Sequence, residues 1–487
     1  MKKIKFLSSA FTTAISFLAV YIFYVAVIQN GNLSQMASDQ RTYSQEVKRW
    51  RGCIYDCNMI PLCDRSEAKS QEVYGNTVPV TARYTSESIA GHILGYVDSQ
   101  GNGIGGIEGA FDNILHTDGK SYASFVRDAV GTPIWDNFST LNYSYAPQSN
   151  IKTTLDYKIQ KIAENAASKY IKSGAIVILD TQTFDIKAMV SRPEYNQNNI
   201  ADNLNDEGSP LLNKALCSYN AGSIFKIITT AAALECGIDG EDFCGGGTII
   251  DGVEFLCHNH DGHGQIDFKN AFAKSCNVYF YGLGQRTGGK KIIDMAQRFG
   301  LGNTLININI DQDGGTLPQR EYFTQRECAN ISIGQGEILV TPLQAAYITA
   351  VIANDGIGKS VNIADSIVQY NGTETQNLRS DKSKVVISKS NAIQIGSMMR
   401  ECVLEGTAQG VQNGIVAVAG KTGSAETGWM DNEDNPMVHG WFCGYFPYEN
   451  PRYAMAVFVE NGKSGSTSCI PPFREIVLSI NELYNVN

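Results

Sequence analysis

Three short motifs stand in a fixed order along the chain: Ser223-Ile224-Phe225-Lys226, Ser275-Cys276-Asn277 and Lys421-Thr422-Gly423. Alone, each is common enough to arise by chance, and such residues more often serve as helix caps or turns. Together they form the S-x-x-K, S-x-N and K-T-G set, in which each part supplies something that acyl transfer through a serine requires. The combination therefore predicts both the fold and the chemistry.

The first motif predicts a nucleophile and its base. Ser223 opens the apolar run from Ile224 to Leu234, which predicts a buried helix. Free N–H groups and the positive dipole end at a helix start stabilise an oxyanion. Lys226 falls on the same helix face, within reach of the Ser223 hydroxyl. It acts as a base only when neutral, a state favoured by burial or by a second cation, for which Lys421 is the candidate.

The second motif predicts a proton relay and a substrate contact. Ser275 and Asn277 lie between two apolar stretches, Ala271 to Ala273 and Val278 to Tyr281. We expect the Ser275 hydroxyl to pass a proton between Lys226 and the leaving group. The Asn277 side chain is expected to hold a substrate amide.

The third motif predicts a strand at the edge of a sheet. The β-type run from Gly414 to Gly420 continues into it, so an extended peptide can add as a further strand. Lys421 or Thr422 would then bind a carboxylate, and Gly423 would give the peptide backbone room. The N–H of Ser424 is expected to be the second oxyanion donor.

With these motifs in place, the chain resembles a class B penicillin-binding protein, a monofunctional peptidoglycan D,D-transpeptidase. The resemblance covers most of the chain from about Arg51 onward. Further segments similar to the family are Gly174–Asp180 with Ala188–Pro193, Ser332–Gly336 with Thr341–Gln344, His439–Tyr445, and, in the N-terminal pedestal, Arg51–Asp56 with Gly103–Glu108.

The resemblance implies a two-step reaction. Ser223 attacks the D-Ala–D-Ala carbonyl of a donor stem peptide, and an amine of an acceptor peptide then takes the acyl group. β-Lactams would trap the first step, and neither a cofactor nor a catalytic metal is expected. The family also implies a partner, a SEDS-type membrane glycosyltransferase, because residues 31–150 are too few for a glycan-polymerising domain. The acceptor amine, the oligomeric state and a role in elongation, division or sporulation stay open.

The predicted fold class is α/β, with strands at both ends around a helical middle, which suits an antiparallel sheet flanked by helices. We expect a cytoplasmic tip and transmembrane anchor in residues 1–30, an elongated β-rich pedestal in 31–150 and the transpeptidase domain in 151–487. Phe6 to Ile28 carries no charge and is long enough to span a bilayer. Lys2, Lys3 and Lys5 precede it, which places the N-terminus in the cytoplasm and the catalytic domain outside. A small-x-small cleavage pattern does not follow, so a retained anchor is favoured over a signal peptide.

Composition argues against a nucleic-acid partner and leaves the state of the cysteines open. The formal charge of −10 is spread without long basic runs, which argues against a nucleic-acid partner. Twelve cysteines are many for an exported domain, and Cys244 with Cys257 are candidates for a disulfide. Cys257 and His263, with Cys244, also offer zinc ligands. Because this segment is similar to one found generally in the family, no metal is the expectation, and a structural zinc stays open.

Three other functions fit the serine motif. A class D β-lactamase or an antibiotic-sensing receptor shares Ser-x-Phe-Lys but has an apolar residue in place of Asn277 and no pedestal. A D,D-carboxypeptidase is usually tethered by a C-terminal helix, which residues 471–487 do not supply. The third alternative is a scaffold with an idle site, for which a fluorescent penicillin would leave no label.

Overall fold

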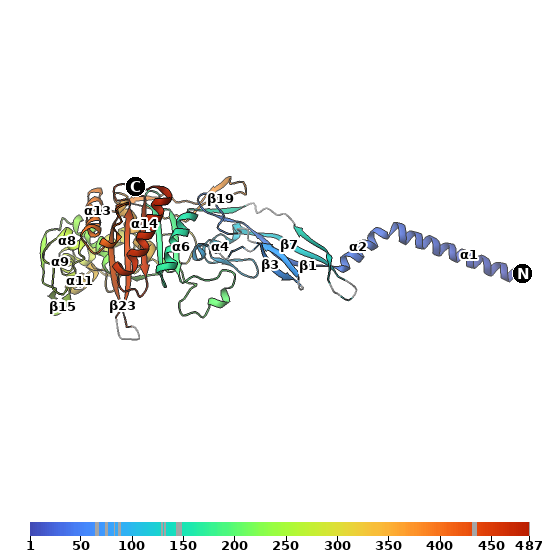
Figure 1. Cartoon of the computed structure of the whole chain (residues 1–487), viewed down its shortest axis with the longest axis horizontal. Helices are drawn as coiled ribbons and strands as arrows, with labels where there is room; N and C mark the ends of the chain where they lie inside the picture. The colour runs from blue at the N-terminus through green and yellow to red at the C-terminus, as the bar shows by residue number, and fades with distance from the viewer. Residues whose placement is uncertain are drawn as a thin grey trace. The chain divides into compact units, whose positions relative to one another are not determined.

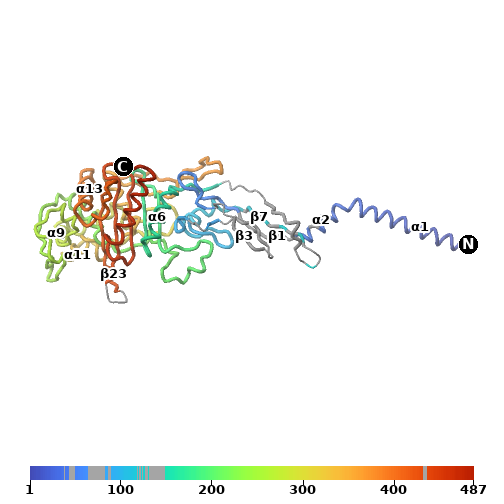
Figure 2. The backbone as a smooth tube through the Cα atoms, in the orientation of Figure 1, coloured from blue at the N-terminus to red at the C-terminus, as the bar shows by residue number. Residues whose placement is uncertain are grey.

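The computed structural model divides into two compact units. The smaller one comprises Met1–Arg51, Ser66–Ala82 and Thr117–Ala146, and the larger one Gly52–Arg65, Arg83–His116 and Pro147–Asn487. The structure describes residues 1–63, 68–73, 76–81, 83–85, 89–127, 130, 133–142, 149–430 and 436–486 (Figures 1 and 2).

The smaller unit begins with a long apolar helix and continues as β-structure. Helix α1 (Lys2–Phe23) runs on through a π-helical turn, η1 (Tyr24–Ile28), and the whole span is long and apolar enough to cross a membrane. Helix α2 (Asn30–Arg41) follows. The strands β1 (Thr42–Arg51), β7 (His116–Arg127) and β8 (Pro133–Asn142) form one sheet in the order β1-β7-β8, and β3 (Ala68–Val73) pairs with β4 (Asn76–Thr81).

Packing divides the chain differently from the predicted boundaries at residues 30 and 150. Strand β2 (Ile54–Tyr55) pairs in parallel with β9 (Asn150–Thr153) of the larger unit. The short helices α3 (Gly91–Leu94), α4 (Gly106–Ala110) and α5 (Asp112–Leu115) bury apolar side chains in that unit's main core. Burial of these side chains joins Gly52–Arg65 and Arg83–His116 to the larger unit, and the three predicted domains stay a prediction.

The larger unit is built on an antiparallel sheet of five strands in the order β11-β10-β24-β23-β22. The sheet pairs strands that lie far apart in the sequence, since Ile176 on β10 faces both Val190 on β11 and Val457 on β24. The strands are β10 (Gly174–Asp180), β11 (Ile186–Arg192), β22 (Ala419–Met430), β23 (Pro436–Phe446) and β24 (Tyr453–Val459). This arrangement pairs the two family-like segments that begin at Gly174 and Ala188, and it confirms the edge position of Lys421-Thr422-Gly423.

Helices cover both faces of this sheet because its strands are apolar on both. Ile176 and Ile178 lie in one core with α6 (Tyr157–Tyr170) and α14 (Ile470–Tyr484), which lie side by side (Figure 1). Ala175 and Val177 alternate with them and pack on the other side, where α7 (Lys226–Glu235), α12 (Pro342–Ala353) and α13 (Lys389–Leu404) lie. The period of two along β10 thus sorts side chains between two helical layers, and the predicted fold class is confirmed.

The remaining elements surround the sheet and its helices. The helices are α8 (Phe268–Ala273), α9 (Asn277–Thr287), α10 (Gly289–Arg298) and α11 (Gln325–Ser332), with single turns η2 (Ile200–Asn203), η3 (Lys214–Leu216), η4 (Gly222–Phe225), η5 (Gln409–Val411) and η6 (Gly465–Cys469). The strands β19 (Ala364–Val368) and β20 (Glu374–Asn377) extend the β2-β9 pair. Two-stranded pairs are β5 (Tyr96–Val97) with β6 (Gly103–Ile104), β12 (Tyr219–Asn220) with β17 (Leu339–Val340), β13 (Glu241–Cys244) with β16 (Gly264–Asp267), β14 (Gly247–Ile250) with β15 (Val253–Leu256), and β18 (Ile357–Lys359) with β21 (Ser383–Val385).

Candidate active site

The serine of the first motif lies one turn earlier than the start of the α-helix. Sequence analysis placed Ser223 at the opening of an α-helix, whereas the structure has the 3-10 turn η4 there and begins α7 at Lys226. Gly222 starts the turn with φ +54°, a conformation that favours glycine. Ile224 and Phe225 are buried, so they anchor the turn, and the half-buried Ser223 faces the cleft.

Lys226 is fully buried and held by the second motif. Its Nζ donates hydrogen bonds to the carbonyl oxygen of Ser275 at 2.8 Å, to Ser275 Oγ at 3.2 Å and to Asn277 Oδ1 at 2.8 Å. It also lies 5.0 Å from the centre of the Phe280 ring. Among the described residues, its hydrogen bonds do not include one to the Ser223 hydroxyl, so the lysine is joined to Ser275 rather than to Ser223.

Two causes lower the pKa of Lys226 well below the ordinary lysine value. Burial is the larger cause, because removing the ammonium from water disfavours its charge. The nearby cation Lys421 is the second. Burial also lowers the pKa of Lys421, which is fully buried itself. Both effects shift Lys226 toward the neutral form relative to an ordinary lysine.

Ser275 and Asn277 are presented by the junction of two helices. Ser275 follows the end of α8 with φ +56°, a left-handed conformation that is uncommon for a residue with a side chain. Cys276 caps α9, where its Sγ accepts from the N–H of Tyr279 at 3.5 Å, and Asn277 is the first residue of that helix. The strained serine and the helix start together aim two polar groups at Lys226.

The third motif lies on β22, where successive side chains alternate between the cleft and the buried face of the strand. Thr422 and Ser424 face the cleft, while Lys421 is fully buried, with its Nζ donating to the carbonyl oxygen of Thr422 at 3.1 Å. The Thr422 hydroxyl forms a hydrogen bond with the hydroxyl of Thr407. Because Lys421 is buried, it acts on the cleft through its charge, whereas Thr422 and Ser424 are the residues of this motif and its neighbour whose hydroxyls line the cleft.

Glycines let β22 approach η4, the nucleophile turn that carries Ser223. A Cβ on Gly423 would lie 2.9 Å from Cγ2 of Ile224 and 3.1 Å from Cβ of Trp441. A Cβ on Gly222 would lie 2.7 Å from the carbonyl oxygen of Ser424. The predicted reason for Gly423, room for a bound peptide, is therefore revised: the space beside it is filled by Ile224, and the glycine brings the strand against the turn that carries Ser223.

The cleft brings together five of the predicted residues, namely Ser223, Ser275, Asn277, Thr422 and Ser424. It has a volume of about 830 Å³. Sequence analysis missed several lining residues: Glu254, Leu256, His258, Tyr281, Thr407, Glu426 and Lys463. Gln335 and Gly336, which also line it, belong to the segment singled out as similar to the family, so that segment carried a usable signal. Thr407 carried none, because its role depends on a contact with Thr422.

His439 is packed rather than poised for proton transfer. Its ring lies edge-on to those of Tyr219 and Phe458, and its Nδ1 accepts from the N–H of Asn461 at 3.3 Å. Burial lowers its pKa, which keeps the ring neutral. A disulfide between Cys244 and Cys257, one of the possibilities left by the sequence, is not formed, and both are free thiols.

Comparison with known proteins agrees with this site. Residues 174–477 match the penicillin binding protein transpeptidase domain. The Peptidoglycan D,D-transpeptidase PbpA of Mycolicibacterium smegmatis is 28% identical over 91% of this chain and 92% of its own length. PbpA of Mycobacterium tuberculosis is 32% identical over 64% of this chain and 67% of its own length. The crystal structure of the D,D-transpeptidase domain of a peptidoglycan glycosyltransferase from Eggerthella lenta superposes with a TM-score of 0.71, at 25% identity, over 90% of this chain and 100% of that one.

A serine turn, a buried lysine and an edge strand lie around one cleft, on a sheet between two helical layers, which is the arrangement expected of penicillin-recognising proteins with these three motifs. The match spans more than half of the chain, and the relatives are class B proteins. The chain therefore belongs to the penicillin-binding protein transpeptidases, in class B.

Proposed function

We propose that this protein is a peptidoglycan D,D-transpeptidase that works through an acyl-enzyme on Ser223. The single observation that carries the mechanism is the fully buried Lys226, whose Nζ lies 3.2 Å from Ser275 Oγ at the cleft that Ser223 lines. A buried amine next to a hydroxyl relay is what a serine nucleophile needs for its activation. The relatives named D,D-transpeptidases support the same activity.

Acylation follows from these positions. Ser223 Oγ attacks the D-Ala–D-Ala carbonyl and loses its proton to neutral Lys226, with the Ser275 hydroxyl as relay. The backbone N–H groups of Ser223 and Ser424 stabilise the oxyanion, in keeping with the close approach of β22 to the nucleophile turn. The lysine then protonates the departing nitrogen through Ser275, and D-alanine leaves. An acceptor amine attacks the ester in the second step and gives its proton to the lysine. As the ester bond breaks, the lysine returns this proton through Ser275 to Ser223 Oγ, which restores the hydroxyl and the neutral amine.

Substrate contacts divide between the strand and the helix start. Asn277 holds the donor amide, and the hydroxyls of Thr422 and Ser424 hold the terminal carboxylate. Lys421, which is buried on β22, supports this carboxylate by its charge and, after burial, is the second cause that lowers the pKa of Lys226. Gly423 serves by allowing the strand to reach the turn.

Intact-mass measurement after penicillin exposure tests the nucleophile. We expect one stable penicilloyl adduct per chain, absent from Ser223→Ala. Ser466→Ala is the matched control, because Ser466 lines the same cleft on η6 and should leave the adduct unchanged. A full adduct on Ser223→Ala would refute the assignment. Loss of the adduct with time would indicate a β-lactamase, and no adduct on the wild-type protein would indicate an idle scaffold.

The proposed location is the cell membrane, with one retained span, a cytoplasmic N-terminus and an extracytoplasmic catalytic domain. The apolar span from Lys2 to Ile28 and its N-terminal lysines support this orientation. Its side chains are exposed along the whole of α1, as those of a lipid-facing helix are. The partner proposed from family resemblance is a SEDS-type glycosyltransferase, contacted through this helix and residues 51–108.

Exchange of the span tests the partner. Replacing residues 6–28 with an unrelated spanning helix should preserve penicillin binding, because the cleft lies wholly in the larger unit. It should weaken co-purification with the polymerase and reduce glycan polymerisation by the reconstituted pair. If the exchanged protein and substitutions within residues 51–108 all behave like the wild type, the helix is only an anchor.

A further inference from the structure

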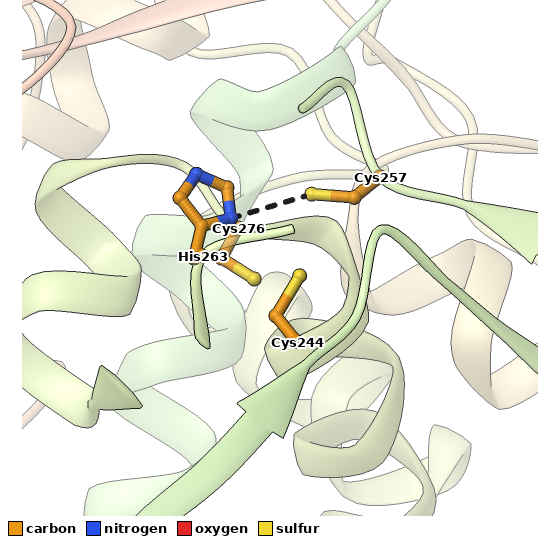
Figure 3. A group of neighbouring side chains, drawn as sticks. All are labelled: Cys244, Cys257, His263 and Cys276. Carbon is orange, nitrogen blue, oxygen red and sulfur yellow. Dashed lines mark hydrogen bonds between the residues drawn. The ribbon is translucent and has the colours of Figure 1, made fainter. Parts of the chain in front are cut away.

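We propose that Cys244, Cys257, His263 and Cys276 bind one zinc ion, and that this ion fixes the S-x-N segment beside Lys226. Their four ligand atoms all lie within 4.8 Å of one another. Cys257 Sγ is 3.7 Å from His263 Nδ1, and the four side chains converge on one point (Figure 3). In a tetrahedral site with bonds of about 2.0–2.3 Å, ligand atoms lie about 3.3–3.8 Å apart, so small side-chain rotations complete the coordination.

The cluster has the composition of a structural zinc site. Three thiols and one imidazole form the Cys₃His set, and all three cysteines are buried, which suits a closed site without an open position for substrate. Zinc would displace the three thiol protons as it binds. The expectation of no metal is thereby revised for a structural ion, while a catalytic metal has no place in this coordination. Cys276 was missed as a ligand because it lies inside a catalytic motif.

The backbone is built to bring these ligands together. The N–H of His263 donates to the carbonyl oxygen of Cys244 at 3.0 Å, and the N–H of Cys257 donates to that of Gly246 at 2.9 Å. Gly246 and Gly262 have φ +93° and +79°. A Cβ on Gly246 would collide with the carbonyl oxygen of His260, and one on Gly262 with that of Cys244. Only glycine permits the close approach of these two loops.

The segment that carries three of the ligands has little core of its own. It consists of two hairpin-like pairs, β13 with β16 and β14 with β15, and such pairs are marginally stable alone. Apolar side chains that would be expected inside are outside instead: Phe243 is 65% exposed and Ile249 75%. A metal staple supplies the stability that a small core cannot.

The fourth ligand connects the metal to the active site. Cys276 lies between Ser275 and Asn277, the two residues that bind Lys226 Nζ. Ser275 is held with φ +56°, a left-handed conformation that is unfavourable for a residue with a side chain. A Zn–S bond at the next residue fixes the backbone that maintains this conformation. The ion therefore acts as a positioning element for the proton relay.

Metal content of the full-length protein tests the site directly. Purified in detergent with a reductant and without chelator, the chain should contain about one zinc, and cobalt exchanged into it should show the spectrum of a tetrahedral thiolate site. Cys244→Ser and Cys257→Ser should reduce the zinc to below about 0.1 per chain. Cys328→Ala is the matched control, because Cys328 is a buried thiol on α11 outside the cluster.

Two results would overturn the site: less than about 0.1 zinc per wild-type chain together with no cobalt spectrum, or disulfides among these cysteines in the protein purified with reductant. Both are measured on the wild type, so variants that fail to fold leave the test intact.

The positioning role rests on the proposed function and has its own readout. Chelation should slow penicillin acylation by about tenfold or more, and zinc should restore it. Unchanged acylation of the metal-free protein would refute the positioning role alone. If the wild-type protein contains zinc but forms no penicilloyl adduct, the proposed function is refuted instead.

Discussion

Replacing Gly222 with alanine should disable the active site through a contact between the nucleophile turn and the edge strand. The new Cβ would lie 2.7 Å from the carbonyl oxygen of Ser424 and 2.9 Å from Cβ of Ala425. Neither neighbour is the end of a flexible side chain, so the turn and the strand must separate. Overpacking of this kind costs about 1–3 kcal/mol, and the left-handed φ of +54° adds about 1–2 kcal/mol for alanine.

Gly237→Ala is the matched control. Gly237 follows α7 with φ +65°, and a Cβ there would have no atom within 4 Å. Both variants carry the free-energy cost of an alanine with left-handed φ, while only Gly222→Ala moves Ser223 relative to β22. A misplacement of about 1 Å costs about 10²-fold in rate, so acylation should fall about that far in Gly222→Ala and stay near normal in Gly237→Ala.

Stopped-flow acylation by a fluorescent penicillin, with melting midpoints of both variants, separates the two effects. The melting midpoint should fall in both variants, and further in Gly222→Ala. If Gly222→Ala remains folded and acylates at the wild-type rate, contact between the turn and β22 does not position the nucleophile. If Gly237→Ala loses acylation equally, backbone strain alone explains the effect, and the proposed role of the contact fails.

Lys226→Arg should bind penicillin reversibly yet acylate about 10²–10⁴-fold more slowly, because a guanidinium stays protonated; near-normal stopped-flow rates would mean that another group takes the proton. Because its pKa is lowered, Lys226 becomes neutral at a lower pH than an ordinary lysine, so the acylation rate should rise with pH and level off below the usual lysine range. Removing the second cation in Lys421→Met should shift this rise to higher pH, and an unshifted profile would show that burial alone sets the pKa. Arg379→Met should lower the melting midpoint, because Asp185 is buried and accepts from Arg379 at 2.6 and 3.1 Å, and breaking a buried pair costs about 3–5 kcal/mol. A midpoint within error of the wild type would show that Lys187, 3.6 Å from Asp185, compensates the charge.

Much of the site was predictable because its signals are local. The spacing of Ser223 and Lys226 indicated one turn of helix, and the β-type run before Lys421 indicated a strand. A further local feature is Asp156, which caps α6 by accepting from the N–H groups of Lys158 and Ile159. These features depend on residues a few positions apart, for which backbone hydrogen bonding and side-chain periodicity give a direct rule.

The sequence alone determined the order of the motifs and the apolar span, and it carried the hypothesis of a serine acyl transfer. Only the tertiary structure decided that Lys226 is held by Ser275 and Asn277, that Lys421 is buried, and that Gly423 packs against Ile224. It also decided which cysteines lie close together, since Cys276 lies beside three residues of the segment from β13 to β16, namely Cys244, Cys257 and His263. Burial and convergence are properties of segments far apart in the chain, and a charge loses its hydration only when those segments close around it.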